Sequence, residues 1–466
     1  MTETAARTNS TPELARDLKV SHAAAIVVGT IIGSGIFLVP SEMMQAVGSS
    51  GLVYLAWMVG GLLSFFGAVT YAELGAMKPQ AGGEYVYVRD GYGPLGGFLY
   101  GWTYFLIAKP ASLATIVIGL VRIIGTFPHM TFLADPIVSS PVIITKGHMV
   151  AIAAIAFIAF INYIGVKKAG EFQLFFTSLK VAMIACIVVG GFTYAQGNWG
   201  NFHTSYAAAT GGFGGFMVAL IAALWAYDGW NLVTTVSGEM RDPQRSLPIA
   251  LILGVAIVAV LYMGVNAAVQ FVMPADAIAA SPRPASQAML IAWGTFGAGL
   301  VSAGMALSML VTLNGSSMTG ARIPFALSRD GYFFHFLAKV HPKFRTPSNS
   351  LIVQAVLGAL LVVLGGNFQQ LFSLALYPEW VFYMLATASV FIFRRKEPNA
   401  ARPYRTWGYP VVPALFIAAS CVVLVYTFKA KLVNSLLATA VILAGIPVFY
   451  VFRSRTRAAN VTRTTM

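Results

Sequence analysis

Apolar residues fill long stretches of the chain, and Gly, Pro and charged clusters separate one stretch from the next. Most stretches are close to the twenty or so residues that a helix needs to cross the hydrocarbon core of a bilayer. The pattern predicts about twelve transmembrane helices. Their expected limits are residues 20–45, 52–77, 94–125, 148–164, 172–194, 212–237, 247–273, 287–327, 350–365, 368–393, 411–428 and 432–452. The stretch at 287–327 is too long for one simple span, so we expect it to be tilted or to extend beyond the membrane.

The composition agrees with this pattern. Of the 466 residues, 58% are hydrophobic and only 10% are charged, whereas about a quarter of a soluble domain is charged. Too few polar side chains remain to cover a globular surface, which excludes a soluble enzyme. The fold class is therefore an all-α polytopic membrane protein. The N-terminal stretch contains no short apolar core followed by a small-residue cleavage site, so we expect the first span to direct membrane insertion.

The charge is lopsided, with 30 Lys and Arg against 16 Asp and Glu and a formal net charge of +14. Such an excess in a soluble protein would suggest nucleic acid. Here most of the basic residues fall in the loops and tails on one side of the predicted membrane, the side that also holds both termini. By the positive-inside rule that side is cytoplasmic. The charge therefore predicts orientation and no nucleic-acid partner, and it leaves Lys109 and Lys180 inside spans.

The first span contains a cluster of glycines in the stretch GTIIGSGIF, with Gly29, Gly33 and Gly35 at mid-depth. Each lowers helix propensity by about 1 kcal/mol relative to Ala. One interpretation is close helix packing through small residues, which fits Gly29 and Gly33. The other is an unwound segment, where the amides of Ser34 and Gly35 begin the next half-helix and could hold an anionic group.

The sixth span raises the same question, because Asp228 lies near its middle. Gly229 follows it, and Trp225 and Asn231 lie close by. A carboxylate in hydrocarbon is costly, so Asp228 should face a cavity or a partner. The first and sixth helices are corresponding members of two five-helix halves, and two interrupted segments at matching positions are typical of an inverted-repeat transporter. The two halves share no strong residue-by-residue repeat.

Two lysines lie inside spans. Lys180 could extend to the interface, or its ammonium could lie against the carbonyls of an unwound helix and a hydroxyl, replace a coupling cation and exchange a proton. Lys109 precedes Pro110, which frees a backbone carbonyl, so we expect Lys109 to have a structural role near that carbonyl.

Other candidate residues receive simpler interpretations. Glu73 should form an interfacial salt bridge or gate contact with the nearby Lys78, and Glu379 should lie in the outer interface without a functional role. Cys186 and Cys421 should be small apolar residues in the helix packing. We expect no disulfide framework, no metal site and no cofactor.

Five stretches together resemble one known family. They are VVGTIIGSGIF, YAELGAMKPQAGGEYVYVRDGYG, AYDGWNLVTTVSGEMRDPQRSLP, TLNGSSMTGARIPFALSRDGYF and RRKEPNAARPYRTWGYPVVP. Their order and content are similar to the amino acid, polyamine and organocation (APC) permeases, and within them to the L-type amino acid transporters and their bacterial relatives. The resemblance extends from about Leu18 to Pro413, nearly the whole predicted helical core.

The resemblance implies a fold of two inverted repeats of five helices, as in the bacterial leucine transporter, with helices 1 and 6 discontinuous. The first repeat would span residues 18–194 and the second residues 212–393. Two peripheral helices would occupy residues 411–453. Cytoplasmic tails would occupy residues 1–17 and 454–466.

The resemblance also implies an L-amino acid substrate at mid-membrane. The substrate carboxylate would bind the backbone amides of Ser34 and Gly35. Its ammonium would bind the carbonyls of Ile31, Trp225 and Asp228. Both placements agree with electrostatics, since half-helix N-termini favour anions and unwound carbonyls favour cations.

Further positions match functional residues of the family. Trp225 matches an aromatic gate that is often Phe, so its larger ring favours smaller neutral substrates. Asn231 matches a residue of the same site, and Trp380 matches a position at the side-chain pocket, although packing explains Trp380 equally well. Lys180 and Thr312 match the lysine and hydroxyl that replace a sodium ion, which implies sodium-independent transport.

The leading hypothesis is an exchanger of neutral L-amino acids that works by alternating access. Alternatives are a cationic amino acid or polyamine permease that uses the Asp228 carboxylate, and proton-coupled uptake through Lys180. A channel lacks a filter motif here. A membrane-embedded hydrolase lacks a placed nucleophile and base, since all six histidines fall in loops or near helix ends. The loop at residues 122–147 has no cysteine, so we expect no disulfide-linked heavy chain.

Overall fold

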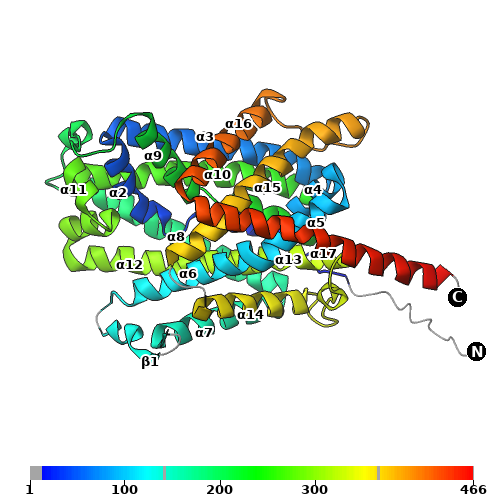
Figure 1. Ribbon diagram of the computed structural model, residues 1–466. Coiled ribbons are helices and arrows are strands. Elements are labelled where there is room, and N and C mark those ends of the chain that lie inside the picture. Colours follow the sequence, from blue (N-terminus) through cyan, green and yellow to red (C-terminus); the bar gives the residue numbers. More distant parts are fainter. Residues whose placement is uncertain (1–12, 128, 140–142, 365–367, 465–466) are drawn as a thin grey trace, which may run out of the picture.

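The computed structural model describes residues 13–127, 129–139, 143–364 and 368–464. These residues form a bundle of long helices that run side by side (Figure 1). The helix α4 and the C-terminal end of α17 lie at one end of the bundle, and α11 and β1 lie at the other. The predicted all-α polytopic fold is confirmed.

The helices follow one another with short connections. Their bounds are α1 (Val20–Ile31), α2 (Gly35–Val47), α3 (Ser50–Met77), α4 (Glu84–Tyr92), α5 (Pro94–Thr103), α6 (Lys109–Ile124), α7 (Lys146–Tyr163), α8 (Val166–Phe192), α9 (Gly212–Ala226), α10 (Pro243–Val272), α11 (Ala275–Ala280), α12 (Pro284–Gly320), α13 (Arg322–Arg329), α14 (Ser348–Leu364), α15 (Phe368–Lys396), α16 (Val411–Ala430) and α17 (Leu432–Thr464). A π-helical turn (Tyr104–Ala108) joins α5 to α6, and 3₁₀ segments occupy Thr131–Ala134, Trp199–His203, Trp230–Glu239 and His335–Ala338. The strands β1 (Pro136–Val138) and β2 (Ile144–Thr145) pair antiparallel.

Within the described residues, 11 helical segments are long and apolar enough to cross a membrane. The helix α14 is also apolar but shorter, with 17 residues, and it occupies the ninth predicted span. Each of the twelve predicted stretches therefore coincides with an apolar helix or an interrupted pair of helices.

The stretch predicted at 287–327 divides into two helices, α12 and α13. The backbone of α12 leaves helical geometry at Gly294, where φ is 65° and ψ is −153°. A side chain would strain this conformation, which glycine adopts readily. The kink and the break before α13 explain how so long an apolar stretch fits the bundle.

The chain ends differ in part from expectation. The helix α17 continues to Thr464, so most of the predicted tail at 454–466 is helical. Residues 1–12 of the predicted tail at 1–17 lie outside the described residues.

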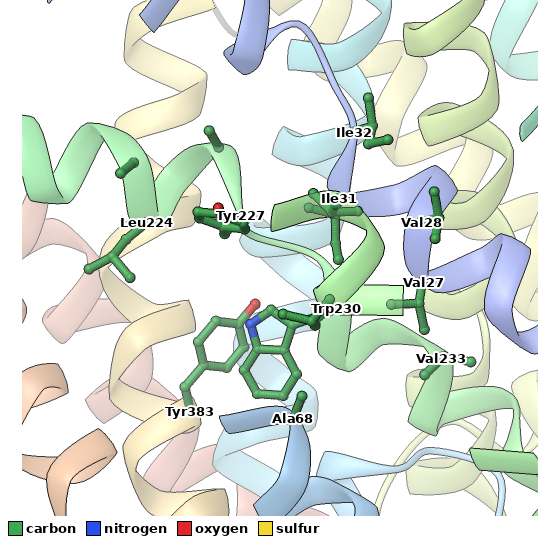
Figure 2. Close-up of a cluster of buried hydrophobic side chains, with 14 of the residues drawn as sticks. Val27, Val28, Ile31, Ile32, Ala68, Leu224, Tyr227, Trp230, Val233 and Tyr383 are labelled. Atoms are coloured by element: carbon green, nitrogen blue, oxygen red, sulfur yellow. The ribbon is translucent and has the colours of Figure 1, made fainter. Parts of the chain in front are cut away.

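Both predicted helix interruptions are present, and they lie against each other. The helix α1 ends at Ile31 and α2 begins at Gly35, while α9 ends at Ala226 and a 3₁₀ segment begins at Trp230 after Gly229 with a φ of 103°. The Thr30 hydroxyl donates a hydrogen bond to the Gly229 carbonyl at 2.9 Å. Figure 2 shows the extended backbone that carries Ile31 and Ile32 between the two half-helices.

Close helix packing explains one glycine of the cluster, and the unwound segment explains another. A Cβ atom at Gly29 would collide with the side chains of Gln173 and Thr177, so Gly29 is a close-packing position. A Cβ atom at Gly33 would meet nothing within 4 Å, because Gly33 lies in the unwound segment beside open space. Small-residue packing therefore brings α8 up to the turn that precedes the break.

At the α4 end of the bundle, the two interrupted spans are joined. The Leu18 amide donates to the Glu239 carbonyl at 3.0 Å, and the Arg241 amide donates to the Leu18 carbonyl at 3.0 Å. The Arg322 guanidinium binds both carboxylate oxygens of Glu239 at 2.7 and 2.9 Å, and both side chains are fully buried. These contacts hold the two interrupted spans together at this end of the bundle.

Two simpler predictions need correction. Glu73 forms its salt bridges with Arg394 and Arg402, and Lys78 pairs with Glu397 at 2.9 Å. The reason is that the C-terminal end of α15 and the residues that follow it lie against the end of α3. Cys186 and Cys421 are exposed on the outside of the bundle, so they do not belong to its interior packing.

Candidate functional site

A cavity of about 130 Å³ lies at the two interruptions. It is lined by Thr30, Ile31, Gly33, Ser34, Gly35, Ser112, Thr115, Ile116, Trp225, Ala226, Asp228, Met309, Thr312, Leu376 and Glu379. The lining thus includes most of the predicted site residues. The lining does not include Asn231, Trp380 or Lys180.

One wall of the cavity is the break between α1 and α2. Because α1 ends at Ile31, the amides of Ser34 and Gly35 donate to no backbone carbonyl of the described residues. They stand at the positive end of the α2 dipole, which favours an anion.

Two carbonyls at the breaks already accept hydrogen bonds. Ile31 accepts from the Tyr262 hydroxyl at 3.2 Å, and Trp225 accepts from the Asp228 amide at 3.1 Å and from the Tyr227 amide. Since a carbonyl oxygen has two lone pairs, that of Ile31 can still accept from a bound cation. This wall can therefore hold both charges of a small zwitterion.

Lys180 lies behind the break and is only 1% exposed, which excludes extension to the interface. Its ammonium donates to the carbonyls of Gly29 at 3.0 Å and Ile32 at 2.6 Å. The Thr312 hydroxyl lies 3.1 Å from the same Gly29 oxygen and 3.3 Å from the Ile32 oxygen.

The Ser308 hydroxyl, one turn before Thr312, also donates to Ile32, at 2.7 Å. Sequence reasoning missed Ser308, although its spacing of four residues from Thr312 places both hydroxyls on one face of α12. The two hydroxyls and the ammonium thus converge on carbonyls that the break leaves without helical partners.

Asp228 is tied to a buried network by Tyr383. The Tyr383 hydroxyl lies 2.7 Å from Asp228 Oδ1 and 3.1 Å from Asn231 Oδ1. Trp380 packs against the Tyr383 ring, with centroids 5.8 Å apart, and Figure 2 shows the Tyr383 ring beside that of Trp230. Asn231 and Trp380 therefore contact Tyr383, and Tyr383 in turn contacts the cavity residue Asp228. Sequence reasoning did not identify Tyr383.

The network continues to Glu84, a fully buried carboxylate at the start of α4. Glu84 accepts from Asn231 Nδ2 at 3.0 Å, from the Tyr71 hydroxyl at 2.6 Å and from the Tyr100 hydroxyl at 2.8 Å. Burial raises the pKa of the Glu84 carboxyl, and the donated hydrogen bonds oppose that shift. The hydropathy pattern placed this residue in a loop, because α4 is short and polar.

The largest correction concerns Lys109 and Glu379. Glu379 is 6% exposed and lines the cavity, and its carboxylate lies 3.7 Å from the Lys109 ammonium. Lys109 is 3% exposed and lies over the Tyr104 ring. The partner of Lys109 is thus a carboxylate on the neighbouring helix α15, not a carbonyl freed by Pro110. Glu379 is not an interfacial residue, since α15 extends beyond it on both sides.

Asp228 is therefore not the only carboxylate at this depth, because Glu84 and Glu379 lie close to it in the fold. Among the described residues, His, Cys, Asp and Glu side chains form no group of three or more that could hold a metal ion. The carboxylates instead face hydroxyls, an amide and an ammonium.

A second cavity of about 240 Å³ shares Ser34 and Met309 with the first. Its lining also includes Arg122 and Arg283, which lie toward the end of the bundle opposite α4. The second cavity therefore lies next to the first, on the side toward the end of the bundle opposite α4.

Sequence comparisons match nearly the whole chain. The model of a family described as amino acid permease matches residues 18–452. A Bacillus subtilis protein, the serine/threonine exchanger SteT, is 33% identical over 447 residues, which are 95% of this chain and 98% of that protein. The rabbit b(0,+)-type amino acid transporter 1 is 30% identical over 401 residues, covering 85% of this chain and 79% of that protein. The mouse Asc-type amino acid transporter 1 is 28% identical over 448 residues, covering 94% and 81%.

Proposed function

The chain belongs to the amino acid permease family of the APC superfamily, and we propose that it is a sodium-independent secondary transporter that exchanges small neutral L-amino acids. The observation that carries the proposal is the small cavity at the two helix interruptions, which offers free amides on one side and carbonyls on the other. Those groups match the two charges that every amino acid zwitterion carries.

In the proposed complex, the substrate carboxylate accepts hydrogen bonds from the amides of Ser34 and Gly35. The ammonium donates to the carbonyls of Ile31, Trp225 and Asp228. The cavity volume of about 130 Å³ and the large Trp225 ring favour a small side chain over an aromatic one.

Sodium independence rests on Lys180. Its ammonium contacts the Gly29 and Ile32 carbonyls, which are oxygen ligands of the kind that a coupling sodium ion would need. With Thr312 on the same carbonyls, Lys180 supplies a fixed positive charge at the break. A proton gained or lost by Lys180 remains the alternative form of coupling.

The relatives support an exchanger, because the name of the Bacillus subtilis protein describes it as a serine/threonine exchanger. The proposed topology has both termini in the cytoplasm, so the joined α4 end of the bundle is the closed cytoplasmic side. Since residues 122–147 contain no cysteine, we expect no disulfide-linked heavy chain.

Exchange in proteoliposomes tests the proposal. Vesicles preloaded with unlabelled serine should take up labelled threonine at least about tenfold faster than empty vesicles, in sodium or potassium buffer alike. Uptake that ignores the internal amino acid would exclude obligatory exchange. Uptake that needs sodium would exclude the proposed role of Lys180, and uptake that follows an imposed pH gradient would favour proton coupling.

A cationic amino acid or polyamine permease is the second candidate, because the carboxylates of Asp228 and Glu379 both line the cavity. Competition of labelled threonine exchange by arginine, agmatine and putrescine distinguishes the two functions. If these cations compete better than serine does, and the Asp228→Asn variant loses their transport, the second candidate is correct.

A further inference from the structure

The geometry points to a carboxylate that recognises the substrate side chain. We propose that Glu379, held by Lys109, accepts a hydrogen bond from a neutral hydroxyl or amide group on the substrate side chain. This inference rests on the proposed amino acid exchange and names the substrate class within it, namely polar uncharged amino acids in preference to hydrocarbons of equal size.

The residues concerned form a polar wall of the cavity, which we define as Lys109, Ser112 and Thr115 of α6 together with Glu379 of α15. The three α6 residues follow one another at a spacing of three, so they share one face of the helix. Ser112, Thr115 and Glu379 line the cavity directly. The two helix breaks would bind the backbone charges of an amino acid, which leaves the polar wall to contact its side chain.

Two groups on the polar wall lack the hydrogen bonds that buried groups normally have. Thr115 is 7% exposed, and in the described part of the chain its hydroxyl has no hydrogen-bond partner. The Glu379 carboxylate lies 3.7 Å from Lys109 Nζ, beyond ordinary hydrogen-bond length, and no other described residue donates to it. Because buried polar groups are usually satisfied, a ligand group that donates and accepts fits here.

Charge then decides which kind of ligand group is preferred. Lys109 offsets the charge of Glu379, so a cationic side chain would have to displace a buried ion pair. An anionic side chain would approach the carboxylates of both Glu379 and Asp228. A hydrocarbon side chain would leave Thr115 and Glu379 without a hydrogen-bond partner at normal distance, at a cost that corresponds to about a tenfold or larger loss in transport. A neutral donor such as the threonine hydroxyl meets none of these penalties.

Threonine and valine provide the test, because they have nearly the same shape and differ by one hydroxyl. Initial rates of exchange in proteoliposomes should favour threonine over valine by about tenfold or more in the native protein. In the double variant Lys109→Met with Glu379→Leu, which removes both charges together, the ratio should fall to within about twofold. Glu171→Gln is the matched control, because Glu171 forms an exposed ion pair with Lys167 and should leave the ratio unchanged.

A second variant keeps the test decisive if the double variant does not fold. Thr115→Val removes a single buried hydroxyl and should lower the threonine to valine ratio several-fold, a readout that does not depend on the absolute rate of either substrate. A native ratio near one, a ratio unchanged in both variants, or faster exchange of lysine or arginine than of threonine would overturn the assignment. Absence of any amino acid exchange by the native protein would instead defeat the proposed function itself.

Discussion

Two buried lysines, Lys180 in α8 and Lys109 in α6, satisfy their charges in opposite ways. Lys180 donates to two backbone carbonyls of the interrupted first span, whereas Lys109 faces the carboxylate of Glu379. Both are nearly inaccessible, at 1% and 3% exposure. Carbonyls are dipoles without net charge, so Lys180 brings a positive charge to the break, while Lys109 and Glu379 form a pair that is neutral overall.

The role of a buried cation therefore depends on the partner that holds it. A cation held by dipoles can take the place of a transported or coupling ion, because it leaves a net charge for other groups to respond to. A cation held by a carboxylate mainly fixes that carboxylate in place. Four predictions test this distinction between the two lysines.

The largest effect is expected for Lys109→Met, which leaves the buried Glu379 carboxylate unpaired. Loss of one partner from a buried ion pair costs about 3–5 kcal/mol of stability. Thermal unfolding of the purified protein in detergent measures this loss. The variant Lys146→Met is the control, because its ion pair with Asp135 is about half exposed and should contribute about 0–1 kcal/mol. Equal shifts for the two variants would contradict the buried pairing.

Lys180→Met should reduce exchange of every substrate about 10- to 100-fold. The Ile32 and Gly29 carbonyls would lose a charged donor, at about 1–3 kcal/mol. Exchange rates in proteoliposomes check this, with Lys168→Met as the control on the exposed face of the same helix. A native rate in Lys180→Met would show that the cation at the break is dispensable.

Gly29→Ala should destabilise the protein by about 1–3 kcal/mol, as overpacking typically does. The added Cβ would meet Gln173 and Thr177 of α8 and push that helix, with Lys180, away from the break. Gly33→Ala is the matched control for unfolding, since its Cβ would meet nothing within 4 Å. If both variants unfold at the native temperature, α8 does not depend on the close approach at Gly29.

The smallest effect is expected for Thr312→Val, which keeps the side-chain shape and removes one hydroxyl. Its hydrogen bond to a break carbonyl contributes about 0.5–1.5 kcal/mol, because Lys180 and Ser308 still donate to the same oxygens. Exchange should fall by about tenfold or less. A loss as large as that of Lys180→Met would mean that the hydroxyl, not the ammonium, dominates the site.

Sequence reasoning located the two interruptions because glycines and a mid-span carboxylate are local signals. It also identified Lys180 as a buried cation, since the neighbouring residues of α8 carry no charge. It misplaced Glu379, because nothing in the sequence of the predicted span at 368–393 indicates the partner on α6. Glu84 was missed for a similar reason, because three of its donors come from α3, α5 and the segment after α9.

The membrane class, the approximate spans and the two points at which helices break follow from local residues. The requirement for hydrocarbon-length apolar stretches and the conformational freedom of glycine both act locally. Which charges meet depends on how the helices pack. Lys109 and Glu379 are 270 residues apart in the chain, and their ion pair exists only because α6 and α15 pack side by side. Burial makes any unpaired charge costly, so the assembled bundle, not the local sequence, selects each partner.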